Sequence, residues 1–161
     1  MFKEKLAEDL TAALRTGDAS RRLVLGMLAS VIKNRELEKR SRLAKQGVPE
    51  TDLQAASELT DDEILEAIAS EVKKRKESAA SFSSGGRPEM AQKEEEELAI
   101  LMHYLPEQMS EDQIRKVVQD VVAQIKPQGI QDMGKVIAQV MARVKGRADG
   151  KLVSQMVREA L

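Results

Sequence analysis

The sequence predicts an all-α protein, and three observations support this fold class. Of its 161 residues, 42% are hydrophobic and 33% charged, but only 2% are aromatic, so few residues favour strands. Apolar residues recur at helical spacing along most of the chain. Helix start and stop signals separate these stretches. We expect an N-terminal multi-helical domain at residues 1–106 and a small C-terminal three-helix bundle at residues 107–161.

The first two predicted helices lie close together in the sequence. Leucine and alanine repeat at helical spacing from the start of the chain, and Gly17 ends that first helix. Asp18 or Ser20 can cap the second helix, which continues into a basic stretch at residues 33–42. A helical pair therefore opens the chain.

The next stretch, residues 45–59, has no clear periodicity and contains Gly47 and Pro49. We predict a mobile loop here, at about residues 45–59. Thr60 and Glu63 then have the spacing of a capping box, in which each residue satisfies a backbone N–H of the other. They predict the start of a long helix.

Serines and glycines at residues 83–86 end that long helix, and Pro88 suits the first turn of the next one. This next helix carries the acidic run 94–97. A helix spreads four consecutive carboxylates around its circumference, so we expect a solvated face and no metal cluster. Pro106 marks the predicted domain boundary, because the residue before a proline is disfavoured in helical conformation.

Three short amphipathic helices are predicted after this boundary. Ser110 and Gln113 form a second capping box, residues 127–129 break the helix that follows, and Asp132 caps the next helix. The bundle has roughly fifty residues, which is near the lower limit for independent folding.

The last two helices are joined by the stretch KGRADGKL, residues 145–152. It is not a nucleotide-binding P-loop, because three residues separate Gly146 from Gly150 and Leu152 replaces the Mg²⁺-binding hydroxyl. We expect a tight turn in which Gly146 ends one helix in a left-handed conformation and Asp149 caps the next.

Positive charge is concentrated at the C-terminal end. Residues 110–161 contain nine Lys/Arg and six Asp/Glu, whereas residues 1–109 contain 17 and 21. Within residues 133–161 the count is six cations and two acids. This asymmetry favours a polyanionic partner at that end.

The chain shows no convincing catalytic constellation. It has no cysteine and a single histidine, His103, for which no nucleophile or base partner is apparent. The serine- and glycine-rich residues 83–86 lack the pattern that flanks an amidase signature. We therefore expect no catalytic residue, no metal site and no cofactor. No membrane span or signal peptide is apparent, and we expect a cytoplasmic protein.

Surface cations near the last turn are the candidate site. Arg147 and Lys151 flank the start of the final helix, where unpaired N–H groups and a partial positive charge attract phosphate. We expect both to be surface charges. With only two Phe and one Tyr in the chain, stacking on bases is not expected, so RNA would be recognised by its backbone and shape. The candidate RNA-binding residues are Lys135, Arg143, Lys145, Arg147 and Lys151.

Three stretches carry a resemblance to a known family: EVKKRKESAASF, EEEELAILMHYLPEQMSEDQI and DMGKVIAQVMARVKGRADGKLVSQMVREAL. They resemble the GatB/YqeY family over almost the whole chain, except that residues 45–59 are longer and less patterned than the family suggests. The resemblance implies a free-standing YqeY-like helical protein. Its C-terminal part is similar to the tail of the GatB subunit of the glutamine-dependent aminoacyl-tRNA amidotransferase, where the tail engages the outer part of tRNA and catalysis lies elsewhere.

The resemblance and the charge pattern together predict a non-catalytic protein that binds tRNA or another structured RNA. No DNA and no membrane are expected as partners. Two alternatives remain: a module that docks a translation-related protein through an apolar groove, and a carbon–nitrogen ligase with glutamine as amide donor, by family association only.

Overall fold

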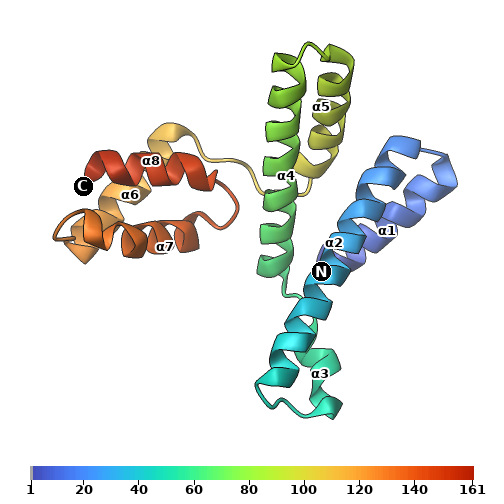
Figure 1. Cartoon of the computed structure of the whole chain (residues 1–161), viewed down its shortest axis with the longest axis horizontal. Helices are drawn as coiled ribbons and strands as arrows, with labels where there is room; N and C mark the ends of the chain where they lie inside the picture. Colours follow the sequence, from blue (N-terminus) through green and yellow to red (C-terminus); the bar gives the residue numbers. More distant parts are fainter. Residues whose placement is uncertain (1) are drawn as a thin grey trace. The chain divides into compact units, whose positions relative to one another are not determined.

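The computed structural model describes residues 2–161 and confirms the all-α fold class (Figure 1). These residues contain eight α-helices, one short 3₁₀ helix and no β-strand. They form two compact units, Met1–Tyr104 and Leu105–Leu161. The helices of the first unit are α1 (Phe2–Thr16), α2 (Ala19–Lys45), α3 (Glu50–Ser57), α4 (Asp61–Ser84) and α5 (Pro88–Met102). Those of the second unit are α6 (Glu111–Ile125), η1 (Ile130–Asp132), α7 (Met133–Val144) and α8 (Gly150–Ala160).

Local signals define the ends of the helices in the N-terminal unit. Gly17 has a φ of 71° directly after α1, and the side chain of Asp18 accepts a hydrogen bond from the backbone N–H of Arg21 at the start of α2. Thr60 and Glu63 form the predicted capping box at the start of α4. Pro88 is the first residue of α5. These predicted boundaries are confirmed.

Residues 45–59, predicted as a mobile loop, contain the helix α3, so the prediction that this stretch has no helix is wrong. The carbonyl of Pro49 accepts hydrogen bonds from the amides of Asp52 and Leu53, at 3.0 and 3.1 Å, and this starts α3. Leu53 and Ser57 are buried, and α3 packs against α2. An eight-residue helix buries too few apolar side chains to produce a clear periodic pattern.

Helices α4 and α5 form a hairpin (Figure 1), and three charged side chains pair between them. Nη1 of Arg75 lies 3.0 Å from Oε2 of Glu94 and 2.9 Å from Oε2 of Glu97. The expected solvated face at residues 94–97 is therefore wrong in part, since Glu97 is buried. The helix spreads the run around its circumference, and two of the four carboxylates face α4.

The last residue of the N-terminal unit, Tyr104, is anchored to α1 and α2. Only 3% of it is exposed. Its hydroxyl donates to Oδ2 of Asp9 at 2.6 Å and accepts from Nη2 of Arg21 at 3.3 Å. Burial, and then the bond to Asp9, raise the pKa of Tyr104. The end of α5 is thereby tied to the first helical pair.

The C-terminal unit is a three-helix bundle around an apolar core. Ser110 and Gln113 form the predicted capping box at the start of α6. Asp132 precedes α7 as predicted, but its side chain does not cap that helix; it accepts from the backbone N–H of Gln128 at 2.8 Å. Asp132 is the last residue of η1, and its carboxylate contacts the loop that precedes η1. The buried core residues come from all three helices and are Ile114, Val118, Val121, Val136, Val140, Val144, Val153, Met156 and Val157.

Candidate nucleic-acid interface

The connection between α7 and α8 is a tight turn with two left-handed residues. Lys145 has φ 36° and ψ 64°, and Gly146 has a φ of 74°. The predicted left-handed conformation of Gly146 is confirmed, although Lys145 already adopts it. Glycine takes this conformation at little cost, whereas a residue with a Cβ is uncommon there. The turn therefore reverses the chain within five residues, so the cations near it lie at one end of the bundle.

Asp149 caps α8 as predicted. Its Oδ1 accepts hydrogen bonds from the backbone N–H groups of Lys151 at 2.8 Å and Leu152 at 3.3 Å. The acidic side chain of the turn is thus engaged with the backbone of its own helix. The side chains of Lys145, Arg147 and Lys151 around it are exposed.

The five candidate RNA-binding residues are all exposed, and four of them lie in or next to the turn. Lys145, Arg147 and Lys151 lie in the turn or the first turn of α8. Arg143 lies in the last turn of α7, where Nη2 donates to Oε1 of Gln124. Lys135 lies in the first turn of α7, about 15 Å from Lys145 along the helix axis at 1.5 Å per residue. It belongs to the opposite end of α7.

One further cation was missed in the sequence. Arg158 is exposed and lies seven residues after Lys151 on α8. Seven residues are close to two helical turns, so both side chains share one face of the helix. Neither forms an ion pair within the described part of the chain. The seven-residue spacing is the sequence signal that identifies Arg158.

Arg147 is exposed, as expected for a surface charge, and its side chain is also bonded to the backbone of a distant segment. Its Nε donates to the backbone carbonyl of Glu107 at 3.1 Å. Its own carbonyl accepts from the amide of Met109 at 2.8 Å. The side-chain amide of Gln108 adds bonds to the carbonyls of Pro106 and Gly146, both at 3.0 Å. The segment Pro106–Met109 therefore lies against the turn, and no pattern in the sequence announces this contact.

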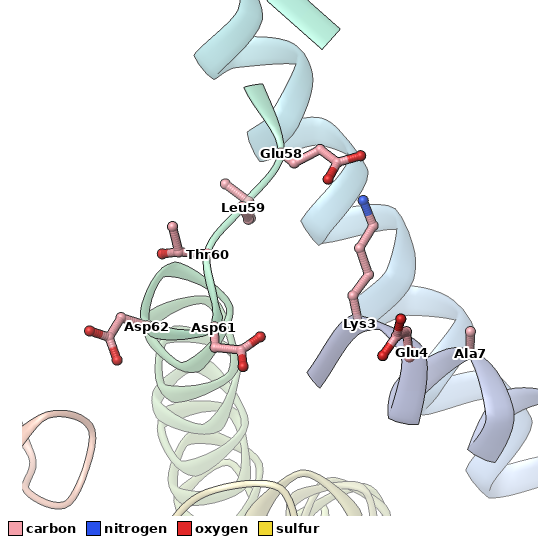
Figure 2. A pocket seen from close by; sticks show the side chains of 8 residues that line it. All are labelled: Lys3, Glu4, Ala7, Glu58, Leu59, Thr60, Asp61 and Asp62. Atoms are coloured by element: carbon pink, nitrogen blue, oxygen red, sulfur yellow. The ribbon is translucent and has the colours of Figure 1, made fainter. Parts of the chain in front are cut away.

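An acidic pocket in the N-terminal unit contrasts with this basic turn. It has a volume of about 800 Å³ and lies between α1 and the connection from α3 to α4 (Figure 2). Figure 2 shows Lys3 and Glu4 on one wall, with Asp61 pointing toward α1 and Asp62 away from it. Lys3 is paired with Glu36 at 2.7 Å. The pocket residues include four carboxylates and one lysine, so a phosphate would be repelled there.

The residues considered for catalysis, His103, Ser83 and Ser84, lie on the surface. His103 is exposed and meets the ring of Tyr104 edge-on, with centroids 5.7 Å apart. Ser83 and Ser84 are exposed at the end of α4. Within residues 2–161, no group of three or more His, Asp or Glu side chains is arranged to hold a metal ion. No helix in this range has the length and apolar character needed to cross a membrane.

These features define an all-α protein whose small C-terminal bundle carries exposed cations at one helix-to-helix turn. Comparison with known proteins identifies its family. Residues 3–161 match the family described as Yqey-like protein, and the chain belongs to this family. The family predicted from the sequence is thereby confirmed.

Two curated relatives match part of the chain. It is 40% identical over 57 residues to one subunit of the glutamyl-tRNA(Gln) amidotransferase of Thermococcus gammatolerans. It is 35% identical over 57 residues to the corresponding subunit of the same enzyme from Thermococcus sibiricus. Each match covers 33% of this chain and 9% of the relative. The chain thus has a partial likeness to an amidotransferase subunit and spans less than a tenth of that subunit's length.

Proposed function

We propose that this YqeY-like protein is a non-catalytic, cytoplasmic RNA-binding protein that contacts the phosphates of tRNA, or of a similarly folded RNA, with its C-terminal unit. The observation that carries the proposal is the turn at residues 145–149. Lys145, Arg147 and Lys151 are exposed around it, and the one acid of the turn, Asp149, is used as a helix cap. Arg143 and Arg158 extend the basic surface along α7 and α8.

The relatives support the choice of tRNA among polyanions. Both relatives are subunits of a glutamyl-tRNA(Gln) amidotransferase, and the matched segment of 57 residues is about as long as the C-terminal unit. Because so little of each relative is covered, amide transfer itself is not part of the proposal. We propose that this chain shares an RNA-contacting part with these subunits.

The aromatic residues support contact with the backbone rather than the bases. Tyr104 is 3% exposed and is held by Asp9 and Arg21. Phe2 and Phe82 are half-buried and belong to the N-terminal unit. Bases that are splayed out need an exposed ring on which to stack. Binding through phosphates should therefore depend little on sequence and strongly on salt.

The proposal is tested by measuring tRNA affinity against salt concentration for the parent and for Arg147→Ala/Lys151→Ala. Each phosphate contact contributes about 0.7 to 0.9 to the logarithmic salt slope. The double variant should therefore bind more weakly and have a slope flatter by about 1 to 2. Melting curves of both proteins are needed, because Arg147→Ala also removes the bond to the carbonyl of Glu107.

A matched control removes two charges elsewhere on the same unit. Lys116 is exposed on α6, and Lys126 follows α6 with a φ of 50° that glycine tolerates. Lys116→Ala/Lys126→Gly should keep most of the salt slope. Equal effects of the two double variants would show that the interaction is a non-specific electrostatic attraction. The proposal is contradicted if the parent protein does not bind tRNA. A protein partner that is retained at high salt after RNase treatment would favour protein docking instead.

A further inference from the structure

We propose that Gln108 is a positioning residue for this RNA contact: it holds the segment Pro106–Met109 on the turn, so that the carbonyl of Glu107 orients Arg147 toward a phosphate. This inference rests on the proposed function. It adds to the site an uncharged residue that lies far from the turn in the sequence.

The first step is the attachment of the segment to the turn. Nε2 of Gln108 lies 3.0 Å from the carbonyl oxygen of Pro106 and 3.0 Å from that of Gly146. One side-chain amide thus joins the two stretches across 38 positions of sequence. The amide of Met109 adds a bond of 2.8 Å to the carbonyl of Arg147. Without the Gln108 amide, this backbone bond, the bond from Arg147 and the packing of Met109 on the apolar core would still hold the segment, but less tightly.

The second step is the orientation of the guanidinium. An arginine side chain has five N–H donors, and Nε of Arg147 uses one of them on the carbonyl of Glu107 at 3.1 Å. No acceptor for Nη1 or Nη2 occurs among the described residues. These two nitrogens form the fork that binds phosphate bidentately. The bond to Glu107 therefore fixes the side chain at Nε and leaves Nη1 and Nη2 for a ligand.

The third step is the charge of the anchor. A carbonyl holds Arg147 without neutralising it, and the side chain remains exposed. Arg75 shows the opposite arrangement, because Glu94 and Glu97 neutralise it inside the helical hairpin. An arginine that must bind a phosphate needs to be ordered and still carry its full charge. Arg147 meets both requirements because its anchor is a backbone oxygen.

The expected effect follows from the entropy of ordering one side chain. Immobilising a long side chain on binding costs about 0.5–1.5 kcal/mol, which corresponds to about a two- to tenfold change in affinity. Loss of the anchor should weaken tRNA binding by about this factor. The salt slope should stay unchanged, since no phosphate contact and no charge is removed.

The experiment compares tRNA affinity and salt slope for the parent and Gln108→Met. Methionine has a similar length and no charge but cannot donate to the carbonyls of Pro106 and Gly146. Gln119→Met serves as the control, because Gln119 is exposed on α6. We expect about two- to tenfold weaker binding for Gln108→Met at every salt concentration, and no change for Gln119→Met.

A double-mutant cycle separates positioning from a general structural effect. Arg147→Ala should cost less affinity in the Gln108→Met background than in the parent, because the guanidinium is already poorly oriented there. Lys151→Ala should cost the same in both backgrounds, since its side chain is not held by the segment. Melting curves show whether each variant remains folded at the assay temperature.

The outcomes distinguish this inference from the function on which it rests. If the parent does not bind tRNA, both the positioning role and the proposed function are wrong. If the parent binds tRNA but Gln108→Met binds equally well, the positioning role is wrong and the proposed function stands. Equal coupling of Gln108 with Arg147 and with Lys151 would also overturn the positioning role, because it would show a general loosening of the turn.

Discussion

The two units of this protein use charged residues in opposite ways. The N-terminal unit buries Glu36 and Glu97 and pairs them with cations, whereas the described core of the C-terminal unit is entirely apolar and contains seven valines. The cations of the C-terminal unit are exposed, and several of them lie around one turn. Lysine and arginine therefore stabilise helix contacts in the N-terminal unit, whereas around the C-terminal turn they are exposed.

The difference arises from the groups that surround each cation. Arg75 is enclosed between α4 and α5 and meets two carboxylates, although its Nε finds no acceptor among the described residues and its contact with Glu97 lacks hydrogen-bond geometry. Arg147 is held by a neutral carbonyl in solvent. Exposure and the charge of the neighbouring group, rather than residue type, decide whether a cation supports the fold or serves a site.

Loss of the buried charge pairing should have the largest effect. Arg75→Ala leaves two carboxylates without a partner, and breaking a buried ion pair in this way costs about 3–5 kcal/mol. We expect a loss of this size in the free energy of unfolding, measured with urea. Lys74→Ala is the control, because the side chain of Lys74 is exposed and pairs with Glu71 within the same helix. It should change stability by less than about 1 kcal/mol. Similar losses in both variants would show that the triad does not hold the hairpin.

Low pH should destabilise the N-terminal unit more than the C-terminal unit. This loss of stability should be smaller than that caused by Arg75→Ala. Burial raises the pKa of Glu36, but the bonds from Lys3 and the amide of Leu59 outweigh it and hold this pKa below its ordinary value of 4.5. Lys39 and the amide of Thr60 lower the pKa of Glu63. A lowered pKa in the folded state gives stability that is present above pH 4.5 and is lost as the pH falls further.

Hydrogen exchange on the full chain can follow this acid effect in each unit separately. Protection of the N-terminal unit should fall more steeply than that of the C-terminal unit between about pH 5 and about pH 3, a window set around and below the ordinary value of 4.5. Glu36→Gln should make the N-terminal decline shallower. If both units lose protection in parallel in the parent and in the variant, the buried Glu36 pair does not set their acid sensitivity.

Of these changes, loss of the Asp149 cap should have the smallest effect on stability. It should lower stability without weakening tRNA binding. Asp149→Ala removes the two bonds to the amides of Lys151 and Leu152 and should cost about 1 kcal/mol of unfolding free energy. Affinity for tRNA should stay the same or rise, because a negative charge leaves the site. Asp149→Asn keeps a capping oxygen and should restore most of the stability. Weaker tRNA binding by a folded Asp149→Ala would contradict the role assigned to this turn.

The sequence alone determined the fold class and most helix ends. Thr60 with Glu63, Ser110 with Gln113, and Asp149 act on backbone groups no more than three residues away, so their effect does not depend on the rest of the chain. The same local rules fail for α3, whose start rests on the carbonyl of Pro49 and whose stability rests on packing against α2. They also fail for Asp132, whose side chain accepts a hydrogen bond from the backbone of Gln128 instead of capping α7.

The sequence also located the candidate cations, but the tertiary structure decided which of them lie together and how they are held. Lys135 is separated from the others by the length of α7, while Arg147 is joined to Glu107 across 40 positions. Glu97 and Gln108 look like ordinary surface residues in the sequence, yet one is buried against Arg75 and the other ties Pro106 to Gly146. Helix capping is a short-range interaction that a local pattern reveals. Burial of a charge and the anchoring of an arginine depend on which distant segments meet, and only the folded chain brings those segments together.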